Sequence, residues 1–89
     1  MGRKRTKEMI ERAKLVYSVL MENKGRDIPT KDLLFRIIKI DPAIDYSMLY
    51  QALRILRDKG FIMQKYRGKV SCWTIAKEAS VSELEMKLS

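Results

Sequence analysis

Hydrophobic positions in the first quarter of the chain recur every three or four residues, which is the spacing of an amphipathic helix. The pattern begins after Thr6, a good N-cap residue, and ends at NKG, residues 23–25, where Gly25 suits the left-handed position that follows a helix. The apolar stripe consists of Met9, Ile10, Ala13, Val16, Tyr17, Leu20 and Met21. We therefore predict a first helix, with residues 1–7 as a basic arm.

The same spacing returns near residue 30 and predicts a second helix. Thr30 is placed as its N-cap, and Pro29 and Leu34 are positioned to pack as a hydrophobic staple. The expected buried stripe is Leu33, Leu34, Ile37 and Ile38. The sequence DPAID at 41–45 ends this helix, because a proline disfavours helical geometry at the residue before it.

A third helix is predicted over about 46–59, with Asp45 able to cap its start and Gly60 ending it. Its expected core side is Leu49, Ala52, Leu53 and Leu56. The opposite side carries Ser47, Tyr50, Gln51, Arg54 and Arg57 or Asp58. Aromatic, amide and guanidinium groups are prominent among these side chains. This side is either an ordinary solvated helix face or a binding face.

Two stretches rich in aromatic and β-branched residues, 61–66 and 69–75, predict a β-hairpin. Arg67 and Gly68 form the expected two-residue connection, because glycine can take positive φ. Trp73 and Ile75 share one strand face, which we assign to the core, and Cys72 falls on the other face.

The C-terminal segment, 79–89, predicts one more short helix. Ser80 and Glu83 have capping-box spacing, and Val81, Leu84 and Leu88 form an apolar stripe. This stripe is a candidate dimer surface, as is the apolar excess of the first helix; the alternative is that both pack on their own core. The fold class is therefore α+β and mostly α, with a domain at 8–78 followed by this helix.

Charge narrows the choice of partner. The 89 residues include 19 Lys and Arg against 11 Asp and Glu, a formal net charge of +8. Such a balance favours a polyanion, most commonly nucleic acid, over the alternative of a basic protein without such a partner.

The residue types give little support for catalysis or for metal binding. The chain has no histidine and one cysteine, which excludes histidine acid–base catalysis and a structural zinc site. We expect no enzyme activity, no catalytic residues, no metal and no cofactor. No apolar run approaches the roughly 20 residues that span a bilayer, so we expect no membrane association and an intracellular, cytoplasmic or nucleoid-associated, location.

The order of helices and hairpin, together with the sequences SMLYQALRILRDKGFI and MQKYRGKVSCWTIA, resembles the winged helix-turn-helix family of DNA-binding regulators. The resemblance covers roughly residues 8–77. The matching positions are Ser47, Leu49, Tyr50, Ala52, Leu53, Leu56, Lys59, Gly60, Phe61 and Ile62. Ile55 departs from the pattern, since many relatives have a charged residue there. It is expected to pack under the hairpin, or the helix position is shifted.

The resemblance implies that the third helix enters the major groove of double-stranded DNA, where Arg suits guanine edges and Gln suits adenine edges. Expected base contacts are Ser47, Tyr50, Gln51 and Arg54. Expected contacts to the backbone or minor groove come from Tyr46, Arg57, Thr30 and Lys31, and from Lys65, Tyr66, Arg67 and Lys69 of the wing hairpin, about 61–76. Arg3, Lys4 and Arg5 of the N-terminal arm are further candidates. Each has a plain alternative: a helix cap, a solvent-exposed lysine or a basic terminus.

These features predict a sequence-specific DNA-binding protein that regulates transcription, acting as a homodimer if its operator has two-fold symmetry. Two alternatives stay open. In the first, the domain is a protein-interaction module in a larger assembly, because fold does not settle function. Alternatively, Tyr46, Tyr50 and Tyr66 stack on the bases of single-stranded nucleic acid or RNA.

Overall fold

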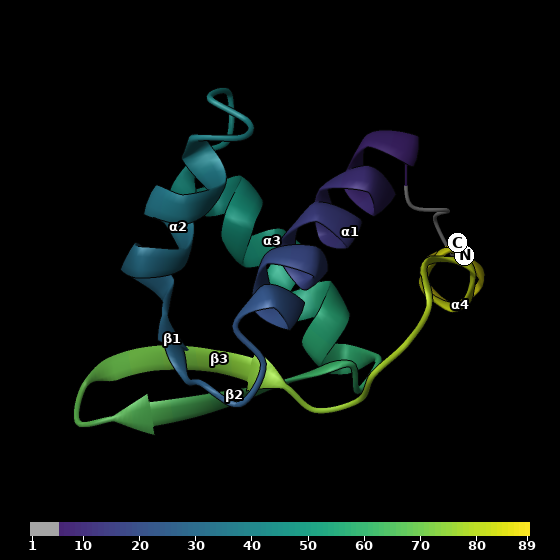
Figure 1. Cartoon of the computed structure of the whole chain (residues 1–89). Helices are drawn as coiled ribbons and strands as arrows, with labels where there is room; N and C mark the ends of the chain where they lie inside the picture. The colour runs from purple at the N-terminus through teal and green to yellow at the C-terminus, as the bar shows by residue number, and fades with distance from the viewer. Residues whose placement is uncertain (1–5) are drawn as a thin grey trace.

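Three helices stand on one side of a small antiparallel sheet, and a fourth packs beside the first (Figure 1). This computed structural model describes residues 6–89. The elements are α1 (Lys7–Glu22), β1 (Ile28–Pro29), α2 (Thr30–Ile38), α3 (Tyr46–Asp58), β2 (Ile62–Arg67), β3 (Val70–Ile75) and α4 (Val81–Leu88). The predicted order of helices and hairpin is confirmed, and the fold is a mostly helical α+β winged helix.

The sheet has a third strand that the sequence did not reveal. Its order is β1-β3-β2, and β1 pairs Ile28 with Trp73 and Pro29 with Cys72. This pairing keeps Pro29 extended (φ −60°, ψ 146°), and α2 begins one residue earlier than predicted. Pro29 is the N-cap and Thr30 is the first helical residue, which corrects the predicted Thr30 cap and its hydrophobic staple.

The hairpin turn lies one residue later than predicted. Arg67 pairs with Val70, which leaves Gly68 and Lys69 as the two connecting residues. Gly68 has φ +62°, a backbone conformation that is unfavourable for side chains with a Cβ. The shift places Lys69 at the tip itself.

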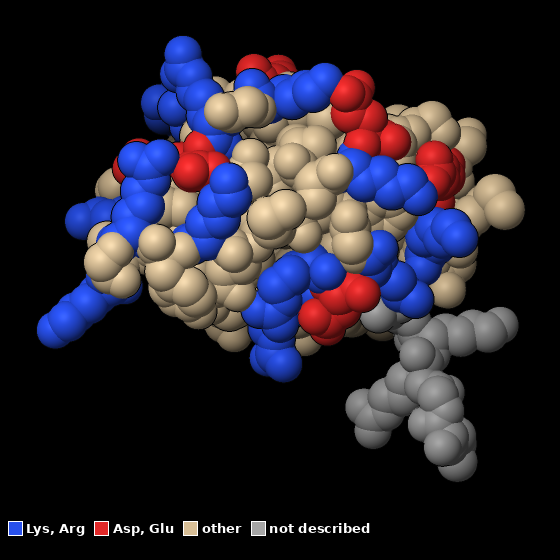
Figure 2. All heavy atoms as spheres, turned by 90° about the horizontal axis from the view of Figure 1, so that it is seen from below, with Lys and Arg blue, Asp and Glu red and all other residues tan. Residues whose placement is uncertain are grey.

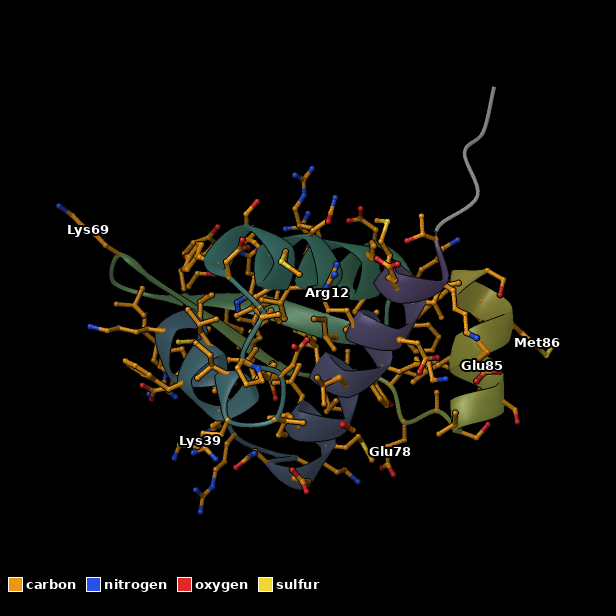
Figure 3. The ribbon with its side chains drawn as sticks, turned by 90° about the horizontal axis from the view of Figure 1, so that it is seen from above. Arg12, Lys39, Lys69, Glu78, Glu85 and Met86 are labelled. Carbon is orange, nitrogen blue, oxygen red and sulfur yellow. The ribbon has the colours of Figure 1, made fainter. Side chains whose placement is uncertain are left out.

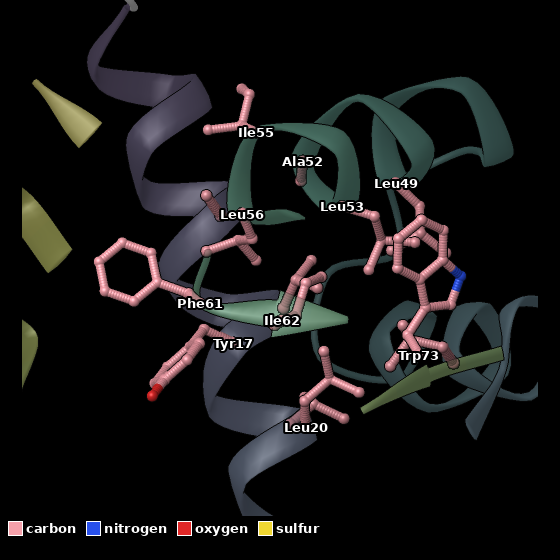
Figure 4. Close-up of a cluster of buried hydrophobic side chains, with 14 of the residues drawn as sticks. Tyr17, Leu20, Leu49, Ala52, Leu53, Ile55, Leu56, Phe61, Ile62 and Trp73 are labelled. Atoms are coloured by element: carbon pink, nitrogen blue, oxygen red, sulfur yellow. The ribbon is translucent and has the colours of Figure 1, made fainter. Parts of the chain in front are cut away.

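The core confirms the predicted inner side of α3. Leu49, Leu53 and Leu56 are fully buried, and Figure 4 shows them gathered with Phe61 and Trp73 of the hairpin segment. Ile55 is buried too, but it points toward α1 and lines a depression together with Met9. The expectation that Ile55 packs under the wing is therefore wrong.

The middle of β3, residues 72–74, is buried on both faces of the strand. Trp73 lies in the core as predicted, whereas Ile75 is only partly buried. Cys72, on the opposite face of the strand, is fully buried as well. Strand alternation predicted the faces correctly but gave no sign that the second face is covered, since β1 was not foreseen.

The C-terminal helix belongs to the same core. Its cap is confirmed: the Ser80 hydroxyl accepts a hydrogen bond from the Glu83 N–H at 3.2 Å. Leu84 and Leu88 are buried in the main hydrophobic cluster, and α4 packs against α1. Their proposed role as a dimer surface is therefore wrong, and only Val81 of that stripe is exposed.

Tyr17 fastens the segment that leads into α4. Its hydroxyl donates to the Lys77 carbonyl at 2.6 Å and accepts from the Ala79 N–H at 2.9 Å. Burial raises the pKa of Tyr17 above its usual value, so the hydroxyl stays protonated and able to donate.

Within residues 6–89, no helix is both long and apolar enough to cross a membrane.

Candidate nucleic-acid interface

The predicted binding face of α3 divides into two stripes. The first, formed by Ser47, Gln51 and Arg54, is exposed and points away from the core. We call these three residues the outward stripe. Within residues 6–89, neither Gln51 nor Arg54 has a side-chain hydrogen bond or ion pair, and both line an open depression beside Ile55 and Met9. Their polar groups are therefore available to a ligand.

The second stripe, Tyr46, Tyr50 and Arg57, faces the hairpin. The Tyr50 ring meets Trp73 edge-on at 5.7 Å between centroids and is half-buried. Tyr46 stacks on Tyr50 at 6.0 Å and stays exposed on its other side. Tyr50 was predicted to contact bases; the structure places its ring half-buried in contact with Tyr46 and Trp73, where it helps to join α3 to the wing.

One glutamine of the wing links this stripe to the hairpin. The Gln64 side-chain nitrogen, which has two hydrogens to donate, lies within hydrogen-bonding distance of three hydroxyls: Ser71 at 2.7 Å, Tyr66 at 3.1 Å and Tyr50 at 3.2 Å. Its carbonyl oxygen accepts from Arg57 Nη1 at 2.6 Å. These contacts join α3, β2 and β3 through a single side chain, which we call the Gln64 junction.

The junction holds Arg57 in place. With Nη1 on Gln64, the second terminal nitrogen of Arg57 lies 3.4 Å from Asp58 Oδ1. The guanidinium is about one-third exposed and is oriented by protein groups on two sides. It sits between α3 and the wing, where the predicted contact to a phosphate backbone remains geometrically open.

The cations of the wing fall into two groups. Arg67 and Lys65 both pair with Asp27, at 3.1 and 3.7 Å, and this carboxylate lies just before β1 and is mostly buried. Lys69 projects from the hairpin tip, as Figure 3 shows. Tyr66, three positions before it in the sequence, is exposed. Within residues 6–89, no acid pairs with Lys69, so its ammonium group is open to a phosphate, whereas Lys65 and Arg67 share one acid.

The start of α2 offers only one of its two predicted contacts. Thr30 is 4% exposed, its hydroxyl donates to the Ser71 carbonyl at 3.0 Å, and it accepts from Trp73 Nε1 at 2.7 Å. The predicted phosphate contact by Thr30 is wrong, because the hydroxyl satisfies a buried indole. Lys31 is exposed and has no ion pair within the described part of the chain.

Charges on the sheet side of the molecule gather at its edges. Figure 2 shows this face from below, with basic side chains around the rim, including the end where the hairpin tip lies, and an uncharged centre. The predicted arm contacts, Arg3, Lys4 and Arg5, lie outside the described residues. Among residues 6–89, no three His, Cys, Asp or Glu side chains gather in a way that could hold a metal ion.

Sequence reasoning missed Gln64 and Asp27. Strand alternation places Gln64 on the same face as Trp73, which was a usable signal that it points toward α3. Asp27 gave no such signal, since its contact with the wing depends on β1.

Neither a protein-family model nor a curated protein matches the chain by sequence. Solved structures do match its fold. A chain of HOP2, studied for its DNA recognition and protein interaction domains and for homologous DNA pairing, aligns with a TM-score of 0.64 at 20% identity, covering 72% of this chain and 97% of that one.

Two ferric uptake regulators, both named Fur, also match. The Helicobacter pylori protein, described as having three functional metal binding sites, gives a TM-score of 0.66 at 24% identity, with 89% of this chain covered. The Francisella tularensis protein, solved with iron, gives 0.63 at 16% identity, with 90% covered. This chain spans 64% and 58% of those two chains, so it matches only part of each. At these identities the likeness establishes the fold.

Proposed function

We propose that this winged-helix protein binds double-stranded DNA and regulates transcription by reading the major groove with α3. The observation that carries the proposal is the uncovered outward stripe, in which Gln51 and Arg54 have no partner within residues 6–89. The major groove admits an α-helix, and these two side-chain types match the edges of adenine and guanine. A structural neighbour described by its DNA recognition domain is consistent with this use of the fold.

The surroundings of the stripe favour a polyanion. The wing brings Lys69 and the Gln64 junction to one flank of α3, and α4 packs against α1 instead of covering α3. Arg57, oriented by Gln64, and Lys31 at the start of α2 are placed to contact phosphates on either side of the groove. Base edges would then be read by the outward stripe, and the register would be fixed by the cations.

A homodimer is part of the proposal only for a two-fold symmetric operator. Two copies would present two α3 helices to half-sites about one helical turn apart. Because Leu84 and Leu88 are internal, the contact between copies must use another surface. Sedimentation of the protein alone and on its selected site distinguishes a dimer in solution from two copies assembled by the DNA.

The test is selection of bound duplexes from a random pool, followed by fluorescence anisotropy on the selected and a scrambled duplex at several salt concentrations. We expect a log-linear fall of affinity with salt on both duplexes and tighter binding to the selected one. Binding that shows neither salt dependence nor sequence preference would overturn the proposal. Competition by the matching single strand tests the tyrosine-stacking alternative, which predicts that the single strand wins.

A further inference from the structure

The outer side of α2 and the turn after it expose three large apolar residues within six positions. Phe35 is 57% exposed, Ile38 39% and Ile40 61%. We call these three residues the α2 patch. Phe35 and Ile38 are three apart on the helix and therefore adjacent on its surface, and Ile40 follows in the turn that ends it.

This cluster differs from the other exposed apolar residues. Met63 and Val70 lie at opposite ends of the hairpin face, and Val81 and Met86 occupy separate turns of α4. Single exposed apolar side chains are normal on a protein surface, whereas a contiguous group rimmed by polar residues marks an interaction site. Sequence patterning had placed Ile38 in the core; it is exposed because Leu33 and Ile37 already fill the buried side of this nine-residue helix.

The rim of the patch is basic. Arg36 and Lys39 are both exposed, and neither has an ion pair within residues 6–89. Lys31, which belongs to the proposed DNA contacts, and one acid, Asp32, lie at the start of the same helix. An isologous contact between two copies of this patch would bring these like charges together, which is unfavourable. The charge therefore favours a partner of opposite sign.

The patch lies away from the outward stripe. In Figure 3, Lys39 and the outer side of α2 project from the side of the molecule opposite to α3. A protein bound to DNA through α3 would leave this side accessible, so both surfaces can be occupied at the same time.

We propose that the α2 patch docks an acidic, amphipathic helix of another protein, with apolar side chains on Phe35, Ile38 and Ile40 and carboxylates on the basic rim. Short apolar anchors at helical spacing, combined with complementary charge, are the established physical basis of helix recognition. This interaction is separate from the proposed DNA binding and does not depend on it.

The test uses three synthetic peptides titrated into the ¹⁵N-labelled full chain. One carries leucines at helical spacing flanked by glutamates, the second carries lysines in place of the glutamates, and the third has the composition of the first in an order that breaks the spacing. We expect the first to bind at least about tenfold more tightly than either comparison peptide, with amide shifts concentrated in residues 31–40.

Three variants make the test specific. Phe35→Ser with Ile40→Ser, and separately Arg36→Glu with Lys39→Glu, should each weaken the first peptide about tenfold. Met86→Ser removes an exposed apolar residue from α4, outside the patch, and should leave peptide binding unchanged. All of these residues are exposed, so the variants should keep the melting temperature of the parent chain.

Several outcomes would overturn the proposal: equal binding of the three peptides, no binding of the first, or amide shifts outside α2. Self-association that is lost with Phe35→Ser and Ile40→Ser would instead identify a second copy of the chain as the occupant. Duplex affinity of the same variants, measured in parallel, should be unchanged for Phe35→Ser with Ile40→Ser, which separates this proposal from the DNA-binding one.

Discussion

Arg54 is the residue on which sequence recognition most depends. It forms the C-terminal end of the outward stripe, it is exposed, and no carboxylate pairs with it among residues 6–89. A guanidinium makes two parallel hydrogen bonds to a guanine edge, which an ammonium cannot reproduce. Arg54→Ala should therefore cost about 1–3 kcal/mol on the selected duplex and relax specificity there. Anisotropy titrations on the selected and scrambled duplexes measure both effects.

Lys69 supplies the matched comparison. It projects from the wing tip, and the proposed DNA binding gives it a contact to phosphates and not to bases. Lys69→Ala should weaken all duplexes alike and lower the salt slope by about one. If Arg54→Ala behaves in this same uniform way, Arg54 contacts phosphates, and the assignment of the outward stripe to base reading is wrong.

The sequence predicted some of these residues and not others for a definite physical reason. Helical periodicity alone places Ser47, Gln51 and Arg54 opposite the leucines, so the outward stripe followed from the sequence. Tyr50 is only 100° from Gln51 around the helix, and its position at the junction depends on where the hairpin folds back. Thr30 was predicted to cap α2 or to contact a phosphate, because nothing local shows that the Trp73 indole reaches it.

The contact between α3 and the wing depends on the Gln64 junction. Its amide joins Tyr50 and Arg57 of the helix to Tyr66 and Ser71 of the hairpin. Gln64→Ala should free Arg57 and allow the hairpin to move relative to α3. We expect duplex affinity to fall several-fold, because a mobile wing must be ordered when DNA binds and this ordering costs free energy. The free energy of unfolding should fall by only about 1 kcal/mol.

Met63→Ala is the control for the junction. Met63 lies on the same strand but on its opposite face, and it is exposed. It should leave duplex affinity unchanged. Amide exchange of β2 and β3 provides the second readout: faster exchange in Gln64→Ala is expected, and unchanged exchange with unchanged affinity would show that the junction does not position the wing.

Asp27 reduces the charge that the wing offers to DNA. It pairs with both Lys65 and Arg67, and a phosphate must compete with it for these cations. Asp27→Asn removes that competition. Affinity for any duplex should rise, and the salt slope should steepen by up to about one. Titrations of a scrambled duplex at several salt concentrations measure this.

Glu22→Gln separates this local effect from net charge. Glu22 is exposed at the end of α1, and the substitution raises the net charge of the chain by the same amount. It should leave the salt slope of the scrambled duplex close to that of the parent. Equal changes in both variants would mean that Asp27 acts only through total charge.

Short elements were the least predictable part of the fold. β1 is two residues long, too short for alternation to reveal it. Its pairing with β3 nevertheless decides where α2 starts and why Cys72 is buried. Long periodic elements such as α1 and α3 were predicted well, because each carries several turns of a consistent apolar stripe.

Charge is distributed unevenly over the whole molecule. Residues 26–69, which contain α2, α3 and the wing turn, carry ten Lys and Arg against five Asp and Glu. Residues 70–89 carry two against three. Acids of this last segment pair with Lys14, Lys24 and Lys77, away from the outward stripe. The segment that carries α2, α3 and the wing turn is therefore more positive than the C-terminal segment, which suits the proposed DNA contacts.

Stability and DNA binding should accordingly be separable. Tyr17 ties the segment before α4 to α1 through the Lys77 carbonyl and the Ala79 N–H. Tyr17→Phe leaves both backbone groups without this partner, at a cost of about 1–3 kcal/mol. The melting temperature should fall, and amides of α4 should exchange faster, because Leu84 and Leu88 dock less firmly on the core.

Duplex affinity measured well below the melting temperature should nevertheless stay at the parent value, since α4 contacts α1 and not the outward stripe. Ser18→Ala removes a neighbouring hydroxyl that bonds only within the exposed surface of α1, and it should leave both the melting temperature and the affinity unchanged. A fall in affinity that parallels the loss of stability in Tyr17→Phe would show that α4 shapes the binding face through α1. The C-terminal helix would then be part of the interface and not only of the core.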